Sequence, residues 1–150
     1  KYIIMGDADD SYNFLELSLF IERLQAGYDM VMGNRFAGGI TKGAMPWLHR
    51  YVGNPFLSSL GRFLFKNNIG DFHCGLRAFT KKCYNIINPQ CNGMEFASEL
   101  VALASIHQMR ICEIPVTLYP DGRKRRPHLR SWRDGFRHMV LLYSLYLLRN

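Results

Sequence analysis

The chain has 150 residues, of which 48% are apolar and 21% are charged, and its formal net charge is +7. This is the composition of a globular domain that can bury a sizeable core, not of a disordered or low-complexity chain. Its four cysteines form no CxxC pair, and no histidine pair has zinc-ligand spacing, so the sequence offers no zinc motif. It has no signal-peptide pattern and opens within a predicted strand, so we expect a piece of a longer protein.

The first predicted element is an apolar strand over residues 2–5, which is followed by Asp7, Asp9 and Asp10. On an extended stretch Asp7 and Asp9 would point the same way and repel each other by roughly 4 kcal/mol at ~4 Å and an effective dielectric of about 20. A divalent cation would remove this repulsion, because hard cations prefer carboxylate and phosphate oxygens. The alternative is a solvated turn with a helix N-cap, which Asp and Ser also suit.

A helix over residues 13–26 and a second apolar strand over residues 28–32 come next. Strand, helix and strand in this order predict a right-handed crossover and a parallel sheet. Ligands in such sheets bind beyond the carboxyl ends of the strands, where the aspartates and Asn34-Arg35 both fall. Carboxylates at one strand end and a guanidinium at the next fit a metal-bound phosphate better than two unrelated turns.

Residues 47–65 return to helical spacing, and Pro55 is expected to kink or divide this helix. Its aromatic and basic side chains suit a helix on a membrane surface, and an ordinary core-facing helix fits equally well. A loop with Asp71 then leads into a short strand near Arg77. Two helices are predicted over residues 80–87 and 94–109, before a strand over residues 110–118 that Pro115 places at an edge or a bulge.

The positive charge is concentrated in residues 121–137, where seven basic and two acidic residues supply +5 of the net +7. Such a segment suits phosphates of a nucleotide, a lipid head group or a nucleic acid. A helix over residues 131–150 ends in a nearly continuous apolar run at 139–148. This run is shorter than the ~20 residues that span a bilayer. It could lie in the membrane interface, begin a longer spanning helix, or pack in a core.

Five segments in this order, DADD, GNRF, DFHCGLRAF, GMEFASEL and EIPVTLYPDGR, resemble the nonprocessive family 2 glycosyltransferases of the GT-A fold. The closest group is the polyprenyl-phosphate sugar transferases akin to dolichol-phosphate mannose synthase. The resemblance implies an α/β, Rossmann-like fold that is incomplete at its N-terminal side, where the nucleotide base is held. Residues 1–130 would form the acceptor-side portion of the catalytic domain, and residues 131–150 a juxtamembrane or membrane-associated helix.

The resemblance also implies a donor site for a UDP- or GDP-linked sugar. Asp7 and Asp9 match the DxD motif, which holds Mg²⁺ or Mn²⁺ on the donor diphosphate. The basic loop at the end of the EIPVTLYPDGR segment would bind the same diphosphate directly through Arg123, Arg125 and Arg126.

An acceptor site is implied by three further residues. Arg35 and Arg77 would position the acceptor phosphate, a bidentate task suited to arginine. Asp71 would orient the sugar or the acceptor, and a role as general base is not expected. We expect Asp9, Asp71 and Arg77 to be the catalytic residues.

The sequence therefore predicts transfer of one sugar from a nucleotide sugar to a dolichyl or undecaprenyl phosphate. The protein would act at the cytoplasmic face of the cell membrane, either peripherally or anchored by segments outside this chain, with no nucleic-acid partner. Residues 129–132 do not match the Q-x-x-R-W motif of processive members, which favours single transfer. The alternative is a non-catalytic basic domain that binds anionic membranes or nucleic acid. A third possibility is that these 150 residues alone are inactive.

Overall fold

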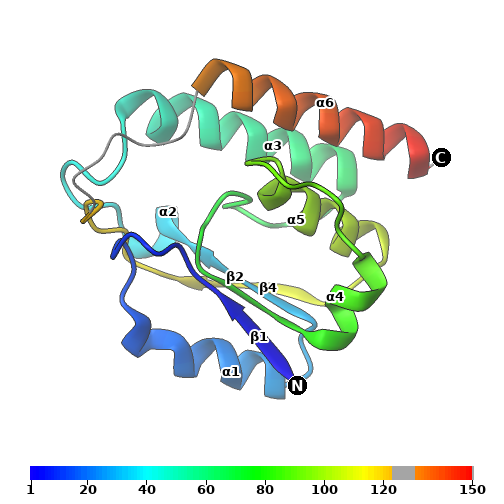
Figure 1. Cartoon of the computed structure of the whole chain (residues 1–150), viewed down its shortest axis with the longest axis horizontal. Coiled ribbons are helices and arrows are strands. Elements are labelled where there is room, and N and C mark those ends of the chain that lie inside the picture. Colours follow the sequence, from blue (N-terminus) through cyan, green and yellow to red (C-terminus); the bar gives the residue numbers. More distant parts are fainter. Residues whose placement is uncertain (123–130, 150) are drawn as a thin grey trace.

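In the computed structural model, residues 1–122 and 131–149 are described, and they form a mixed four-stranded sheet with helices on both faces (Figure 1). The strands are β1 (Tyr2–Met5), β2 (Met30–Asn34), β3 (Arg77–Thr80) and β4 (Ile111–Pro115). The helices are α1 (Leu17–Gln25), α2 (Arg35–Gly38), α3 (Asn54–Phe65), α4 (Lys81–Ile87), α5 (Phe96–Ile106) and α6 (Ser131–Arg149). A 3-10 turn at Phe14–Glu16 and a π turn at His49–Gly53 precede α1 and α3.

The sheet has the strand order β1-β3-β2-β4. Strand β3 is antiparallel to both β1 and β2, and β2 pairs with β4 in parallel. The prediction of a parallel sheet was therefore wrong for β1 and β2, because the distant strand β3 lies between them. Both are antiparallel to β3 and so run in the same direction, and β4 follows β2. Their carboxyl ends meet at one edge of the sheet, as the crossover predicts.

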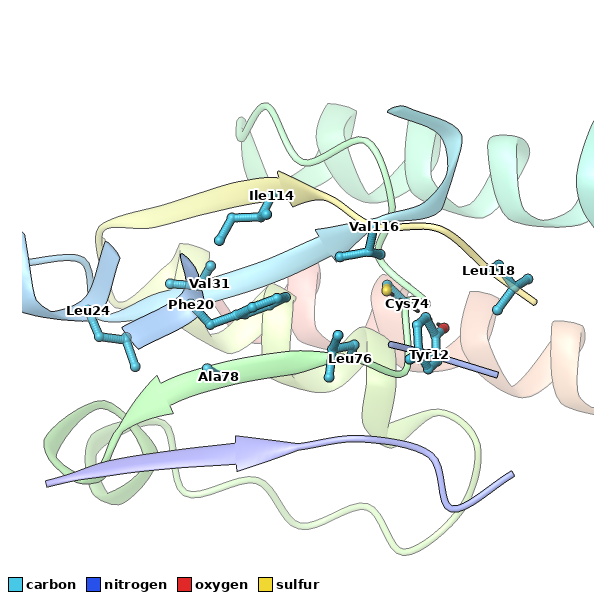
Figure 2. Packing of buried hydrophobic residues seen from close by; sticks show 10 residues of the cluster. All are labelled: Tyr12, Phe20, Leu24, Val31, Cys74, Leu76, Ala78, Ile114, Val116 and Leu118. Atoms are coloured by element: carbon cyan, nitrogen blue, oxygen red, sulfur yellow. Dashed lines mark hydrogen bonds between the residues drawn. The ribbon is translucent and has the colours of Figure 1, made fainter. Parts of the chain in front are cut away.

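The two faces of the sheet carry separate cores, because side chains alternate along each strand. Val31 of β2 points to the α1 side, where it packs with Phe20 and Leu24 (Figure 2). Its neighbours Met30 and Met32 point to the other side, where they pack against α4 and α5. These residues are almost wholly removed from water, and each contributes about 1.5–3 kcal/mol of apolar burial.

A further layer of helices covers α5 on the side away from the sheet. Helices α3 and α6 pack against it through Leu64, Phe65, Ala102 and Leu142. Pro55, which was expected to kink or divide the helix over residues 47–65, lies in the first turn of α3. The chain stays helical there and changes from the π turn at His49–Gly53 to α-helix. Within the ranges that the structure describes, no helix has both the length and the apolarity needed to span a bilayer.

The edge position predicted for the last strand is confirmed. Strand β4 pairs only with β2 among the described strands, and Pro115 closes it. Proline cannot donate to a sheet ladder, so this end suits an unpaired edge.

Candidate functional site

A cavity of about 1040 Å³ opens at the carboxyl-end edge of the sheet, between the strand ends and the outer helices. Asp7, Asp9, Arg35 and Arg77 all line it, so the structure brings together four of the residues predicted from sequence. Other parts of its wall come from the turn before α3, from α5 and from α6. The side walls carry many apolar groups. Asp7, Asp9, Arg35 and Arg77 lie at the strand ends, and Asp134 of α6 is a further charged group of the wall.

The acidic corner of the cavity is built by a bent segment, not by the extended stretch expected from sequence. The chain bends over residues 8–10, and Asp10 has a left-handed φ of 61°. The backbone N–H and hydroxyl of Ser11 both donate to Asp9 Oδ1, which holds this carboxylate in a local turn. Gly75 faces Asp7 so closely that a Cβ there would collide with the carboxylate. The two aspartates still line the same cavity.

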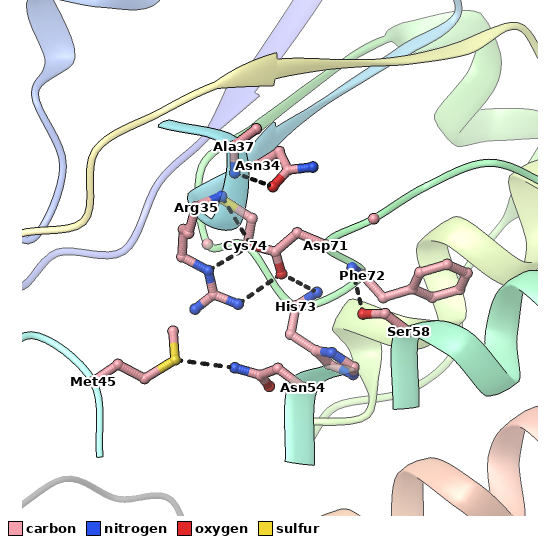
Figure 3. A network of polar contacts seen from close by, with 12 residues as sticks. Asn34, Arg35, Ala37, Met45, Asn54, Ser58, Asp71, Phe72, His73 and Cys74 are labelled. Atoms are coloured by element: carbon pink, nitrogen blue, oxygen red, sulfur yellow. Dashed lines mark hydrogen bonds and ion pairs between the residues drawn. The ribbon is translucent and has the colours of Figure 1, made fainter. Parts of the chain in front are cut away.

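Arg35 and Asp71 form a buried, bidentate ion pair (Figure 3). Arg35 Nε and Nη2 each lie 2.7 Å from an Asp71 carboxylate oxygen, and the Arg35 backbone N–H donates to the same carboxylate at 3.1 Å. The Asn34 side chain caps α2 by accepting from the Ala37 N–H, which fixes the backbone of Arg35, the first residue of that helix. Burial alone would lower the pKa of Arg35, but hydrogen bonds to Asp71 and its charge outweigh this and raise the pKa above its usual value.

Asp71 therefore lies behind Arg35 and His73, two residues that line the cavity and donate to its carboxylate. It has no exposed surface and does not line the cavity. Both of its carboxylate oxygens accept hydrogen bonds from Arg35. Its geometry suits a residue that orients a guanidinium and not one that touches a sugar directly.

Glu113 of β4 is part of this arrangement, and sequence reasoning missed it. Its two carboxylate oxygens accept from the backbone N–H groups of Gly70 and Asp71, each at 2.9 Å. This clamp fixes the loop that carries Asp71 across the sheet edge. The available signal was a single carboxylate within the otherwise uncharged strand Ile111–Pro115.

Arg77 is the second guanidinium at the cavity, and it is 3% exposed. Its Nη2 donates to the carbonyl of Cys74 at 2.6 Å, whereas Nε and Nη1 have no hydrogen-bond partner among the described residues. Burial lowers the pKa of Arg77, and the nearby Asp7 carboxylate partly counters this. Buried N–H donors without a partner are rare in folded proteins, so these two indicate a site for an anion.

Tyr12 closes the floor of the cavity beside Arg77. Its hydroxyl accepts from the Gly75 N–H at 3.0 Å and lies 3.7 Å from the Cys74 sulfur. Burial raises the pKa of Tyr12 and raises that of Cys74 to about 11, so both groups are neutral near pH 7. A floor of neutral groups adds no charge to compete with an anion at Arg77.

Arg123, Arg125 and Arg126 lie outside the described residues, so their placement at a donor diphosphate stays a prediction. Glu99 of α5 does not line the cavity; its carboxylate accepts from the backbone N–H groups of Gln90 and Cys91, each at 2.9 Å. It is buried and secures the loop before α5, which is a structural role.

This α/β architecture, with its charged cavity at the strand ends, is the GT-A fold of glycosyltransferases. The chain belongs to glycosyl transferase family 2, whose sequence profile matches residues 1–86. Glucosyl-3-phosphoglycerate synthase from Mycobacterium tuberculosis, solved with phosphoglyceric acid, has a similar fold with a TM-score of 0.59 and 14% identity. That superposition covers 99% of this chain and 49% of the synthase.

Curated relatives share more of the sequence. The low-salt glycan biosynthesis hexosyltransferase Agl6 of Haloferax volcanii is 39% identical over 139 residues, which are 92% of this chain and 33% of the relative. The dolichyl-phosphate hexose transferase of the same organism is 32% identical over 76% of this chain and 48% of its own length. The polyprenol monophosphomannose synthase of Mycolicibacterium smegmatis is 30% identical over 77% of this chain and 44% of its own. The chain thus spans less than half the length of these relatives.

Proposed function

We propose that the full-length protein transfers one sugar from a UDP- or GDP-linked donor to a polyprenyl phosphate. The observation that carries this proposal is Arg77, a buried guanidinium at the cavity with two donor nitrogens, Nε and Nη1, that lack a partner among the described residues. A phosphate monoester would satisfy both donors and bring the charge that a buried cation needs. The names of the two lipid-phosphate relatives point to the same acceptor class.

The chemistry is a displacement at the anomeric carbon of the donor sugar. An oxygen of the acceptor phosphate forms the new bond, and the nucleoside diphosphate leaves with the electron pair of the broken bond. The nucleophile is already an anion, so no strong general base is needed. Arg35 and Arg77 would hold this phosphate in line, and Asp71 keeps Arg35 oriented through its bidentate pair.

The donor side of the cavity suits a hard divalent cation. No group of three or more His, Cys, Asp or Glu side chains that could hold a metal occurs within residues 1–122 and 131–149. Asp7 and Asp9 nevertheless line the same cavity. Two carboxylates are enough for such an ion when the phosphates of the substrate supply further ligands. These two carboxylates would hold Mg²⁺ or Mn²⁺, which supplies charge stabilisation to the leaving diphosphate when bound. We expect Arg123, Arg125 and Arg126 to bind that diphosphate as well.

The proposed place of action is the cytoplasmic face of the membrane. The outer helices α3 and α6 expose large apolar side chains to solvent, among them Phe63 and Leu148. Basic residues Arg62 and Arg149 lie beside them on the same helices, which is the composition of a surface that binds anionic lipid. A lipid-phosphate acceptor could then enter the cavity from the bilayer.

The proposal is tested with membranes that contain the full-length protein, polyprenyl phosphate and a panel of labelled nucleotide sugars. One sugar should appear in the lipid fraction, and addition of a chelator should abolish the transfer. Arg77→Gln should lower the rate by about 10²-fold or more, because it removes charge and donors at the acceptor phosphate. Asp9→Ala should abolish metal-dependent transfer.

A matched control is Arg110→Gln, which makes the same change at an exposed arginine that stacks on Tyr28 at 5.1 Å. Arg110 precedes β4, at the opposite end of the strand from the cavity. It should retain the wild-type rate. A wild-type protein that transfers no sugar but binds nucleic acid in a salt-dependent way would instead support the alternative of a non-catalytic basic domain.

A further inference from the structure

Three polar side chains from three separate elements form a hydrogen-bonded chain in the wall of the cavity, where His73 and His138 are lining residues. They are His73, in the loop before β3, Ser98 of α5 and His138 of α6. His73 Nε2 lies 2.9 Å from Ser98 Oγ, and Ser98 Oγ lies 2.7 Å from His138 Nδ1. The two imidazole rings also meet edge to face, with centroids 4.7 Å apart. Ser98 is completely buried and His138 is 5% exposed.

The proton count of this chain fixes how the two rings relate. The Ser98 hydroxyl has one proton, so it donates to one imidazole nitrogen and accepts from the other. If His73 Nε2–H donates to Ser98, then Ser98 donates to His138 Nδ1, and both rings carry their proton on Nε2. In the reverse direction both carry it on Nδ1. Two neutral rings must therefore share the same tautomer and change it together.

The unpartnered nitrogen of His73 selects between these two directions. His73 Nδ1 is buried and has no hydrogen-bond partner among the described residues. A buried N–H without an acceptor is rarer than a buried acceptor without a donor. The geometry thus favours His73 as donor to Ser98 and Ser98 as donor to His138, with both protons on Nε2.

The chain continues to the charged pair described above. The backbone N–H of His73 donates to Asp71 Oδ1 at 3.2 Å, and Asp71 holds Arg35. A continuous polar path therefore joins the cavity guanidinium Arg35 to helix α6. Next to His138, the α6 residues Phe136 and Met139 form part of the cavity wall.

The rest of the α6 interface combines apolar packing with two less buried polar contacts. Arg137 forms an ion pair with Glu95, and Arg149 Nη1 donates to the Leu64 carbonyl at 3.4 Å. Leu142 packs against Leu64, Phe65 and Ala102 without polar contacts in that cluster. Apolar packing of this kind stabilises a helix well, and replacing a buried polar network by apolar groups is often neutral or stabilising. A directional network is therefore not needed to attach α6, but it does fix one arrangement. It occurs on the part of α6 that reaches the cavity.

We propose that Ser98, together with His73 and His138, positions helix α6 relative to Arg35 and so sets the shape of the acceptor site. These are positioning residues, since they act through α6 and Asp71 and not on the reacting atoms. The inference rests on the proposed transfer to a lipid phosphate. It adds a set of residues that keeps helix α6, which forms part of the cavity wall, in a fixed position relative to Arg35.

The test compares Ser98→Ala with wild-type full-length protein. Loss of the bridging hydroxyl should raise the KM for polyprenyl phosphate by about tenfold and leave the KM for the nucleotide sugar unchanged. His138→Leu should have the same effect, and His138→Asn should restore most of the wild-type value because its side chain can still bond to Ser98. Ser105→Ala is the matched control: it removes another α5 hydroxyl, which bonds to Asn67 and Val101 and lies away from the cavity. It should leave both KM values unchanged.

Two measurements do not depend on catalysis. Binding of farnesyl phosphate, followed by calorimetry, should weaken by about tenfold in Ser98→Ala and not in Ser105→Ala. Ring nitrogen NMR of the wild-type protein near pH 7 should show His73 and His138 as neutral rings in the Nε2–H form. Failure of sugar transfer by the wild type, with these two results intact, would reject the proposed reaction alone. Unchanged farnesyl phosphate binding and acceptor KM in Ser98→Ala, with only a lower melting temperature, would reject the positioning role.

Discussion

Single residues at the sheet edge show why a buried charge needs its partner. Arg35 and Asp71 are 8% and 0% exposed, so neither charge is screened by water. Such a pair is not a large net source of stability, because desolvation of both charges offsets most of their attraction. Removing one partner is different, since the other is then left charged and buried. The pair thus makes the fold depend on residues that also line or support the candidate site.

Asp71→Asn should accordingly lower the free energy of unfolding by about 3–5 kcal/mol, because Arg35 would keep its charge and lose its counter-ion. Urea denaturation of both proteins measures this difference. Asp29→Asn is a matched control, since the Asp29 carboxylate accepts an exposed hydrogen bond from the Arg110 N–H at 3.0 Å. It should cost less than about 1 kcal/mol. Equal losses in the two variants would show that the buried pair does not carry this role.

The meeting of Asp7, Asp9, Arg35 and Arg77 at one cavity follows in part from local sequence. The first three come after predicted strands, and strands that run in the same direction end at the same edge. The burial of Asp71 and the clamp by Glu113 could not be predicted in this way. Asp71 binds Arg35 across 36 positions of the chain, and Glu113 binds the Asp71 N–H across 42. Local periodicity carries no information about such distant partners.

Secondary-structure elements were likewise predictable where local sequence determines them and not where distant pairing does. Pro55, Pro115 and the apolar spacing of α1 and α5 placed most helices and strands close to their observed bounds. The position of β3 was missed because its place between β1 and β2 depends on non-local pairing. Short strands with apolar residues on both faces fit either a parallel or an antiparallel neighbour.

The docking of α6 should depend on pH. Burial lowers the pKa of both His73 and His138 below the usual 6.5, and neighbouring charges modify it. After burial, His138, Arg35 and Arg77 also lower the pKa of His73. At His138, Glu95 and Asp134 raise the pKa and Arg137 lowers it. The unfolded chain then binds more protons than the folded one as the pH falls below 6.5, so stability is lost in that direction.

We therefore expect the melting temperature to fall between about pH 7 and about pH 5, and to fall less in His138→Asn, which has no titrating ring on α6. Thermal unfolding at a series of pH values measures this slope. Carboxylates also titrate in the range, so the comparison between proteins matters more than the wild-type slope. His107→Asn removes an exposed histidine after α5 and should follow the wild type. Identical slopes for His138→Asn and His107→Asn would show that titration of His138 does not cause the loss of stability.

On the scale of the whole molecule, the layers leave an outer surface that is unusually apolar. Helices α3 and α6 lie side by side on the side of α5 away from the sheet (Figure 1). They meet near their C-terminal ends, where Arg149 Nη1 donates to the Leu64 carbonyl at 3.4 Å. Phe63 and Leu148, next to these contacts in sequence, are 80% and 83% exposed. Exposed apolar groups beside basic ones form a surface that can enter a membrane interface.

Vesicle binding by the 150-residue chain tests this surface directly. In flotation with vesicles rich in anionic lipid, the double variant Phe63→Glu and Leu148→Glu should bind at least about tenfold more weakly, because burying each large apolar side chain contributes about 1.5–3 kcal/mol and the new charges oppose anionic lipid. Leu15→Glu is the control: Leu15 is 91% exposed, but it precedes α1 on the opposite face of the sheet. It should bind like the wild type. Equal weakening by Leu15→Glu would mean that net charge, and not the α3–α6 surface, governs binding, whereas selective weakening would show that the exposed apolar groups of α3 and α6 contact the lipid.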